Sequence, residues 1–167
     1  MTGSLAIGIA VRYLLVVLFF PFSALDKTLN FDGAVAQAQE VFPQRVMGTA
    51  LILIGLAVEI IMPLGILTGV ADRLAALIMA AYCAATGVLF KRFWRPGDFW
   101  KRRQSKGRDL FWDFLKNLSL AGGFLLITVG LDGSALPRFL ADPLASSHPY
   151  ALSSARQANT EAAHVIR

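Results

Sequence analysis

Several side chains that could do chemistry lie inside or at the ends of apolar stretches of this chain. They are Arg12, Asp26, Lys27, Glu59, Asp113, Lys116 and Asn117. A charged side chain at the centre of a membrane span costs about 3 kcal/mol on insertion scales, so such residues mark buried pairs or transport and binding sites. These positions are therefore the first candidates for a site that binds a quinone, a proton or a small polar solute.

Four apolar runs of bilayer length carry these residues. A membrane-spanning helix needs about 20 apolar residues, and the runs cover roughly 7–25, 47–67, 74–90 and 111–131. The chain of 167 residues is 56% hydrophobic and only 16% charged, whereas soluble domains contain about 25% charged residues. The sequence thus excludes the soluble globular class. It predicts an all-α integral membrane four-helix bundle over residues 1–131.

Counting depth along straight spans predicts how the buried polar residues pair. At a rise of about 1.5 Å per residue, Arg12 and Glu59 fall in one layer near the outer side of the membrane. Asp26 and Lys116 come within reach of each other in a second, inner layer, together with Lys27 and Asn117. From the residues alone, a structural role in fixing helix register is favoured over a ligand or proton site.

A basic block between the third and fourth runs predicts the orientation. Residues 91–108 contain eight basic side chains and a single acid, Asp98. Basic loops stay preferentially on the cytoplasmic side, so loop 91–110 is expected in the cytoplasm and both termini in the periplasm. The opposite orientation is the less favoured alternative. A basic block between apolar spans also argues against nucleic acid as the partner.

The segment 90–114 mixes basic residues with aromatic ones, as protein segments at a membrane surface do. Its candidate headgroup contacts are Arg92, Trp94, Arg95, Trp100, Lys101, Arg102, Arg103 and Trp112. Anionic phospholipid is the expected partner of such a surface. General anchoring is favoured over a specific lipid site.

Two connections outside the spans carry further predictions. Asp32 followed by 33–42 is typical of a short interfacial helix that begins at an N-cap and ends before Pro43. The C-terminal segment 132–167 is too polar to span a membrane, and Ser154 with Gln157 is a capping-box pattern. This extramembrane tail is expected to be held by a neighbouring protein subunit.

Cysteine and histidine usage narrows the possible cofactors. Cys83 is the single cysteine, and both histidines, His148 and His164, lie in the polar tail. These residues provide neither an internal disulfide nor a metal site of the Cys/His type, and no histidine is available inside a span for haem. No metal and no covalently bound cofactor is expected, which leaves a quinone or a phospholipid as the candidate ligand.

Three segments, in this order along the chain, resemble the DoxX family of membrane proteins. They are Arg12 with Phe22-Ser-Ala-Leu-Asp-Lys27, the stretch from Gly55-Leu-Ala-Val-Glu59 to Asp72-Arg73-Leu-Ala-Ala76, and Phe114-Leu-Lys116-Asn117-Leu-Ser-Leu-Ala-Gly122-Gly123. The resemblance covers about residues 10–131, and Ala24 stands where the family pattern has glycine. It implies a four-helix protein of the bacterial cytoplasmic (inner) membrane. The residues matching the family's polar pattern are Arg12, Lys27, Glu59, Arg73, Lys116 and Asn117.

The resemblance also implies a functional context. Family members are associated with membrane oxidoreductases, among them a thiosulfate:quinone oxidoreductase subunit and a partner of superoxide dismutase. The leading hypothesis is an accessory subunit, without catalysis of its own, of a larger respiratory or photosynthetic membrane complex. The alternative is a quinone-reactive redox subunit, and a further alternative is a small transporter of solute or protons.

Overall fold

The computed structural model describes residues 3–130, 133 and 135–150, and within them every regular element is a helix. The elements are α1 (Gly3–Val17), α2 (Phe20–Leu29), α3 (Phe31–Gln39), α4 (Arg45–Thr68), α5 (Asp72–Phe90), α6 (Lys106–Val129) and α7 (Leu136–Ala141). The all-α prediction is therefore confirmed. Predicted features at 151–167, including the capping box, lie outside the described residues.

Four segments of the described chain are long and apolar enough to cross a membrane. They are Ala6–Leu29, Arg45–Thr68, Asp72–Phe90 and Lys106–Val129, so the four predicted spans are confirmed with shifted ends. Large apolar side chains such as Leu18, Phe22 and Ile54 are more than half exposed on these helices. Such apolar faces are covered favourably by lipid tails but not by water. The chain is therefore a multi-pass membrane protein.

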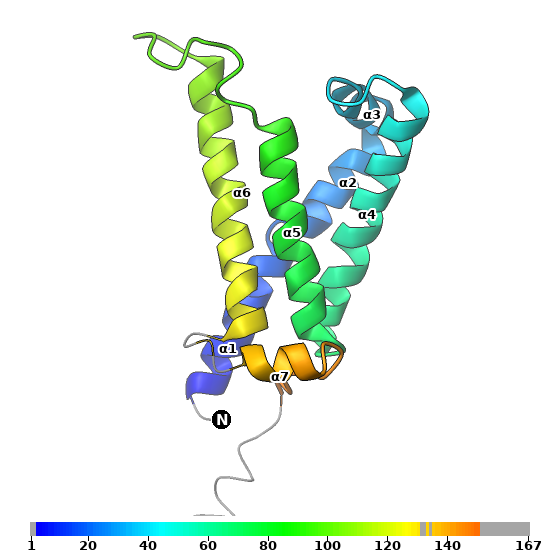
Figure 1. Cartoon of the computed structure of the whole chain (residues 1–167), viewed down its shortest axis with the longest axis vertical. Coiled ribbons are helices and arrows are strands. Elements are labelled where there is room, and N and C mark those ends of the chain that lie inside the picture. Colours follow the sequence, from blue (N-terminus) through cyan, green and yellow to red (C-terminus); the bar gives the residue numbers. More distant parts are fainter. Residues whose placement is uncertain (1–2, 131–132, 134, 151–167) are drawn as a thin grey trace, which may run out of the picture.

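The first span is broken into two helices, which a straight-span prediction does not include. Residues 18 and 19 form a turn between α1 and α2, and Pro21 stands in the first turn of α2. Proline has no N–H to donate to the carbonyl of Val17, so α1 ends there. As a result α2 leans away from the direction of α1 and toward α4 (Figure 1).

The packed core lies where α1, α2, α4, α5 and α6 converge. Phe20, Ile66 and Phe124 have no exposed surface, and the Phe20 and Phe124 rings have centroids 5.6 Å apart. Ala76 and Ala80 bring the backbone of α5 close to its neighbours, which is how small residues act between membrane helices. Toward the α3 end, α4 diverges from α5 (Figure 1).

The two ends of the bundle carry different segments. Helix α3 and the loop 91–105 lie at one end, whereas the start of α1 and helix α7 lie at the other (Figure 1). The interfacial helix begins at Phe31 and ends at Gln39, with Asn30 rather than Asp32 as its N-cap residue. Asp32 instead forms an exposed ion pair, 3.3 Å long, with Arg45.

Helix α6 begins at Lys106, inside the predicted loop 91–110, because side chains of that loop cap its N-terminus. Both carboxylate oxygens of Asp98 accept backbone N–H groups, from Gly107 and Lys106, each at 2.9 Å. The Ser105 hydroxyl donates to the Asp98 carbonyl at 2.7 Å and accepts from the N–H of Arg108. A Cβ on residue 107 would lie 2.8 Å from Asp98 Oδ1, so only glycine allows this approach.

Replacing Asp98 by asparagine is expected to loosen the first turn of α6. Hydrogen bonds hold the pKa of Asp98 below its ordinary value. The largest contribution comes from the Gly107 N–H, and the Lys106 N–H and the Ser105 hydroxyl add to it. Stability from such a group is fully present above its unfolded pKa of about 3.9 and is lost as the pH falls through the lower folded pKa. Hydrogen exchange, corrected for intrinsic rates, should therefore be faster at residues 106–108 in Asp98→Asn at neutral pH.

The matched control for this prediction is Asp109→Asn. Asp109 is an exposed acid in the same helical turn, so it has a similar interaction with the helix dipole. Equal loss of protection in both variants would contradict a specific capping role of Asp98.

Candidate functional site

Lys27 and Glu59 form a buried ion pair near the centre of the bundle. The ammonium group of Lys27 lies 2.6 Å from Oε1 and 2.8 Å from Oε2 of Glu59, whose side chain is 2% exposed. The hydroxyls of Ser23 and Tyr82 donate to Glu59 Oε1 at 3.0 and 2.9 Å. Three helices, α2, α4 and α5, thus place one cation and two hydroxyls around a single carboxylate.

Local sequence features explain why these four side chains meet. Ser23 and Lys27 are four residues apart on α2, so they share one face of that helix, and Lys27 donates to Ser23 at 2.7 Å. Gly55 lies one turn before Glu59 on α4, and a Cβ there would be 3.2 Å from the Tyr82 hydroxyl. The glycine therefore leaves room for the tyrosine to reach the carboxylate.

A cavity of about 290 Å³ adjoins this group, which we call the Lys27–Glu59 cluster (Ser23, Lys27, Glu59 and Tyr82). All four cluster residues line it, as do Cys83 and a set of apolar side chains. The apolar lining comprises Phe19, Phe20, Leu51, Ile52, Ile54, Leu89 and Phe90, with small residues between them. The cavity is mostly apolar, and the Lys27–Glu59 cluster forms a charged, hydrogen-bonding part of its wall.

More polar side chains line the same cavity farther along α5. The Thr86 hydroxyl lies 3.2 Å from Asn117 Oδ1, and the Asn117 amide donates to the Asp113 carbonyl at 3.0 Å. Closer to the loop, the Lys91 ammonium lies 3.1 Å from Asp113 Oδ2. Tyr82, Thr86 and Lys91 therefore extend the polar lining from the cluster toward the α3 end.

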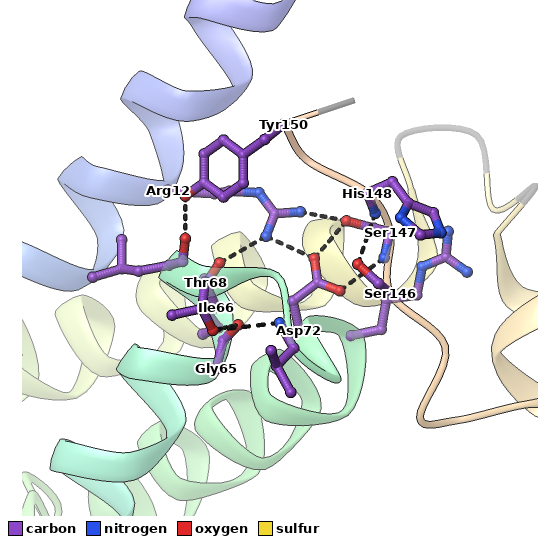
Figure 2. A network of polar contacts seen from close by, with 12 residues as sticks. Arg12, Gly65, Ile66, Thr68, Asp72, Ser146, Ser147, His148 and Tyr150 are labelled. Atoms are coloured by element: carbon purple, nitrogen blue, oxygen red, sulfur yellow. Dashed lines mark hydrogen bonds and ion pairs between the residues drawn. The ribbon is translucent and has the colours of Figure 1, made fainter. Parts of the chain in front are cut away.

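A second buried ion pair, drawn in Figure 2, lies at the α7 end of the bundle, where α5 begins (Figure 1). Arg12 Nη1 is 2.7 Å from Asp72 Oδ2, and the Asp72 side chain is fully buried. The same guanidinium donates to the Ile66 carbonyl at 3.1 Å and to the Ser147 hydroxyl at 2.8 Å. Ser147 in turn donates its backbone N–H to Asp72 Oδ1 at 2.9 Å, and its hydroxyl to Oδ2.

The described part of the C-terminal tail is held by this chain itself. Besides Ser147, Tyr150 donates its hydroxyl to the carbonyl of Leu67. Pro149 packs over Gly69, whose φ of +79° and lack of a Cβ permit the turn between α4 and α5 and this contact. The expected neighbouring subunit is not needed to order 135–150, and for 151–167 it stays a prediction.

The predicted pairing of the buried charges is wrong in both layers. Arg12 pairs with Asp72 rather than with Glu59, and Glu59 pairs with Lys27. Depth counting assumed a straight first span, whereas the break before Phe20 tilts α2 and brings Lys27 to the level of Glu59. Arg12, Lys27 and Glu59 do form buried ion pairs, but their partners do not follow from depth along the spans.

The other predicted site residues have separate environments. Asp26 and Lys116 are both exposed, and Lys116 lies 3.3 Å from Asp113 on its own helix, so the predicted Asp26–Lys116 contact does not form. Asn117 lines the cavity. Arg73 accepts a hydrogen bond from Thr128 at its carbonyl, and its Nε is buried without a partner among the described residues.

The loop residues predicted to contact lipid headgroups are mostly exposed. Trp94, Trp100 and Trp112 are 54%, 90% and 60% exposed. Arg108, absent from the predicted set, organises the loop from inside by donating to the carbonyls of three loop residues: Phe99, Lys101 and Arg103. The predicted contacts are thus available on a structured loop, although lipid binding itself stays a prediction.

Several residues that bond to the two buried ion pairs, or belong to them, were not predicted from the sequence. Asp72 is the first residue of α5, directly after the short turn between two spans, and its adjacency to Arg73 was the available signal. Ser23 could have been found from its four-residue spacing to Lys27. Tyr82, Thr86 and Ser147 carry no sequence signal that distinguishes them from other hydroxyls, and only the packing of distant helices reveals them.

Comparison with known proteins gives one match. The family model DoxX matches residues 8–92, which run from α1 through α5 into the following loop. No curated protein and no solved structure matches this chain. The matched region contains Arg12, Asp72 and the whole Lys27–Glu59 cluster, whereas α6 and the tail lie beyond it.

Proposed function

This chain belongs to the DoxX family, and from that premise we propose that it is the quinone-binding membrane subunit of a larger redox complex. One arrangement carries the proposal: a charged cluster in the wall of a mostly apolar cavity inside a membrane protein. Ligand pockets typically have volumes of about 300–1,000 Å³. The cavity of about 290 Å³ suits a single ring whose hydrophobic tail continues into the lipid.

The donors and acceptors of the cluster suit a quinone ring. Quinone carbonyl oxygens accept hydrogen bonds, and the hydroxyls of the reduced form donate them. Lys27, Ser23 and Tyr82 are donors that line the cavity, and the Glu59 carboxylate is an acceptor among them. When bound, a quinone supplies two-electron chemistry that takes up two protons on reduction.

The residues of this chain would bind the ring and handle protons at defined atoms. Tyr82 and Lys27 would orient the ring by turning toward its oxygens hydrogen bonds that they now donate to Glu59. The Glu59 carboxylate would accept or return a proton beside them. Thr86, Asn117 and Lys91 extend hydrogen-bonding groups from the cluster toward the loop end, which favours proton exchange with that side.

The partner subunits and the orientation rest on the sequence. Family members are associated with membrane oxidoreductases, so the electron donor is proposed to reside on a partner subunit. Eight basic residues in 91–108 support the proposal that this loop lies in the cytoplasm, under the positive-inside rule, and that both termini lie in the periplasm of a bacterial inner-membrane protein.

A binding measurement with a cavity-filling variant tests the proposal. A short-chain ubiquinone should bind the detergent-solubilised chain at about one per protein, and decylbenzene, which has a tail but no carbonyls, should not compete. Ala85→Phe fills the cavity and should weaken binding about tenfold or more, because the ring loses its space. Ala57→Phe, on an exposed face of α4 outside the cavity, is the matched control.

Two outcomes would contradict quinone binding. Equal competition by decylbenzene would reduce the site to a general apolar surface, and equal loss in Ala57→Phe would locate binding outside the cavity. Mild-detergent extraction from native membranes, followed by a native gel and mass spectrometry, tests the partner subunits separately. Recovery of the chain only as a homo-oligomer would remove them from the proposal.

A further inference from the structure

A second cavity lies at the loop end of the bundle and adjoins the first. It has a volume of about 220 Å³ and lies between the end of α3, the end of α5 and the start of α6. Gln37, Leu89 and Phe90 line both cavities, so the two adjoin, and we call the second cavity the mouth.

The lining of this mouth is strongly cationic. Arg92, Arg95 and Lys106 line it, against one acid, Glu40. None of the three cations forms an ion pair with a carboxylate within residues 3–130, 133 and 135–150. An anion is therefore the complementary ligand, and the oxygens of a phosphate group suit Arg and Lys donors especially well.

The rest of the lining indicates which kind of anion. Val41, Leu89, Phe90 and Leu110 form an apolar wall beside the cations. Trp94 and Trp100, both exposed, belong to the loop 91–105 that carries Arg92 and Arg95. Exposed tryptophans beside basic residues mark the headgroup level of a membrane. A ligand with a phosphate at headgroup level and hydrocarbon next to it is a phospholipid.

We propose that Arg92, Arg95 and Lys106 bind the phosphate of one anionic phospholipid in the mouth. The apolar wall contacts the upper part of its acyl chains. The site is more specific than general attraction of a basic loop to a negative surface. Lys101, Arg102 and Arg103 belong to the same loop, are exposed, and line none of these cavities, so they supply general attraction only.

Two charge-matched double variants separate the specific site from general attraction. Arg92→Gln with Arg95→Gln removes two cations that line the mouth, and Lys101→Gln with Arg102→Gln removes two that do not. Neither Arg92 nor Arg95 has a side-chain hydrogen bond or ion pair to another described residue, so both doubles should fold. Thermal melting of each variant checks this.

The probe is short-chain phosphatidylglycerol, titrated into the detergent-solubilised chain and counted by native mass spectrometry. The wild type should bind one molecule at least about tenfold more tightly than phosphatidylcholine, because the choline cation cancels the charge of the phosphate and is repelled by the three cations of the site. The Arg92/Arg95 double should lose about tenfold in affinity, while the Lys101/Arg102 double should change by less than about twofold. Lys106→Gln should weaken binding in the same direction.

Three results would overturn the inference. Equal losses in the two doubles would show general attraction. Equal affinity for phosphatidylcholine would show that the site does not select lipids of net negative charge. Displacement of the lipid by millimolar inorganic phosphate would identify a soluble phosphate compound as the ligand instead. Since the probe is a lipid and none of the substituted residues belongs to the Lys27–Glu59 cluster, these results are independent of quinone binding.

Discussion

Asp72→Asn is expected to lower the free energy of unfolding by about 4 kcal/mol, because breaking a buried ion pair leaves an uncompensated charge. The Asp72 side chain is fully buried and that of Arg12 is 11% exposed. Asparagine keeps the shape and can still accept from Ser147, but it supplies no charge to the guanidinium. The loss should loosen the contact between α1, the start of α5 and the tail.

A double-mutant cycle and a surface pair provide the controls for this experiment. Unfolding by SDS in mixed micelles, followed by circular dichroism, gives the free energies. Arg12→Met combined with Asp72→Asn removes both charges and should be more stable than Asp72→Asn alone. Asp32 and Arg45 form an ion pair with side chains 90% and 77% exposed, so Asp32→Asn should change stability by less than about 1 kcal/mol.

The ion pair is tested directly by the comparison with the surface pair. If Asp72→Asn and Asp32→Asn had equal effects, the buried pair would contribute no more than a solvent-exposed one.

Glu59→Gln is expected to weaken quinone binding by about tenfold or more. The carboxylate accepts from Lys27, Ser23 and Tyr82 and thereby positions all three donors. A hydrogen bond to a charged group contributes about 1.5–3 kcal/mol, and the amide of glutamine both removes the charge and adds donors where acceptors are needed. Equilibrium dialysis of a short-chain quinone against the solubilised variants measures the effect.

Two further variants distinguish ligand binding from a structural effect. Tyr82→Phe removes one hydroxyl that faces the carboxylate and should lower the affinity by less than Glu59→Gln does. Asp113→Asn removes another acid paired with lysines, but one that is 40% exposed and does not line the cavity. Quinone affinity that is unchanged in Glu59→Gln, or lowered equally in Asp113→Asn, would exclude the cluster as the binding site.

The spans and the family were predictable because both depend on local sequence. Hydropathy sums over about 20 neighbouring residues, so the run 47–67 predicts α4 (Arg45–Thr68) to within two residues at each end. The first two segments quoted for the resemblance, from Arg12 to Ala76, lie within the matched region 8–92, whereas the third, from Phe114 to Gly123, lies beyond it. Helix ends were less accurate, since α6 begins at Lys106 under side-chain capping from Asp98 and Ser105.

The sequence carries a local signal for the break in the first span. Pro21 predicts the end of α1 because it cannot donate to the preceding turn. The direction taken by α2 after the break depends on where Phe20 packs, against Phe124 of α6. No count along the first span alone contains that information.

By itself, the sequence determined that this is a multi-pass membrane protein of the DoxX family with charged residues inside its spans. Only the tertiary structure decided their partners: Lys27 for Glu59, and Asp72 with Ser147 for Arg12. The reason is geometric. Hydrophobic content is a sum over neighbours in the chain, whereas an ion pair of 2.6 Å depends on the tilt, rotation and breaks of helices that are distant in sequence.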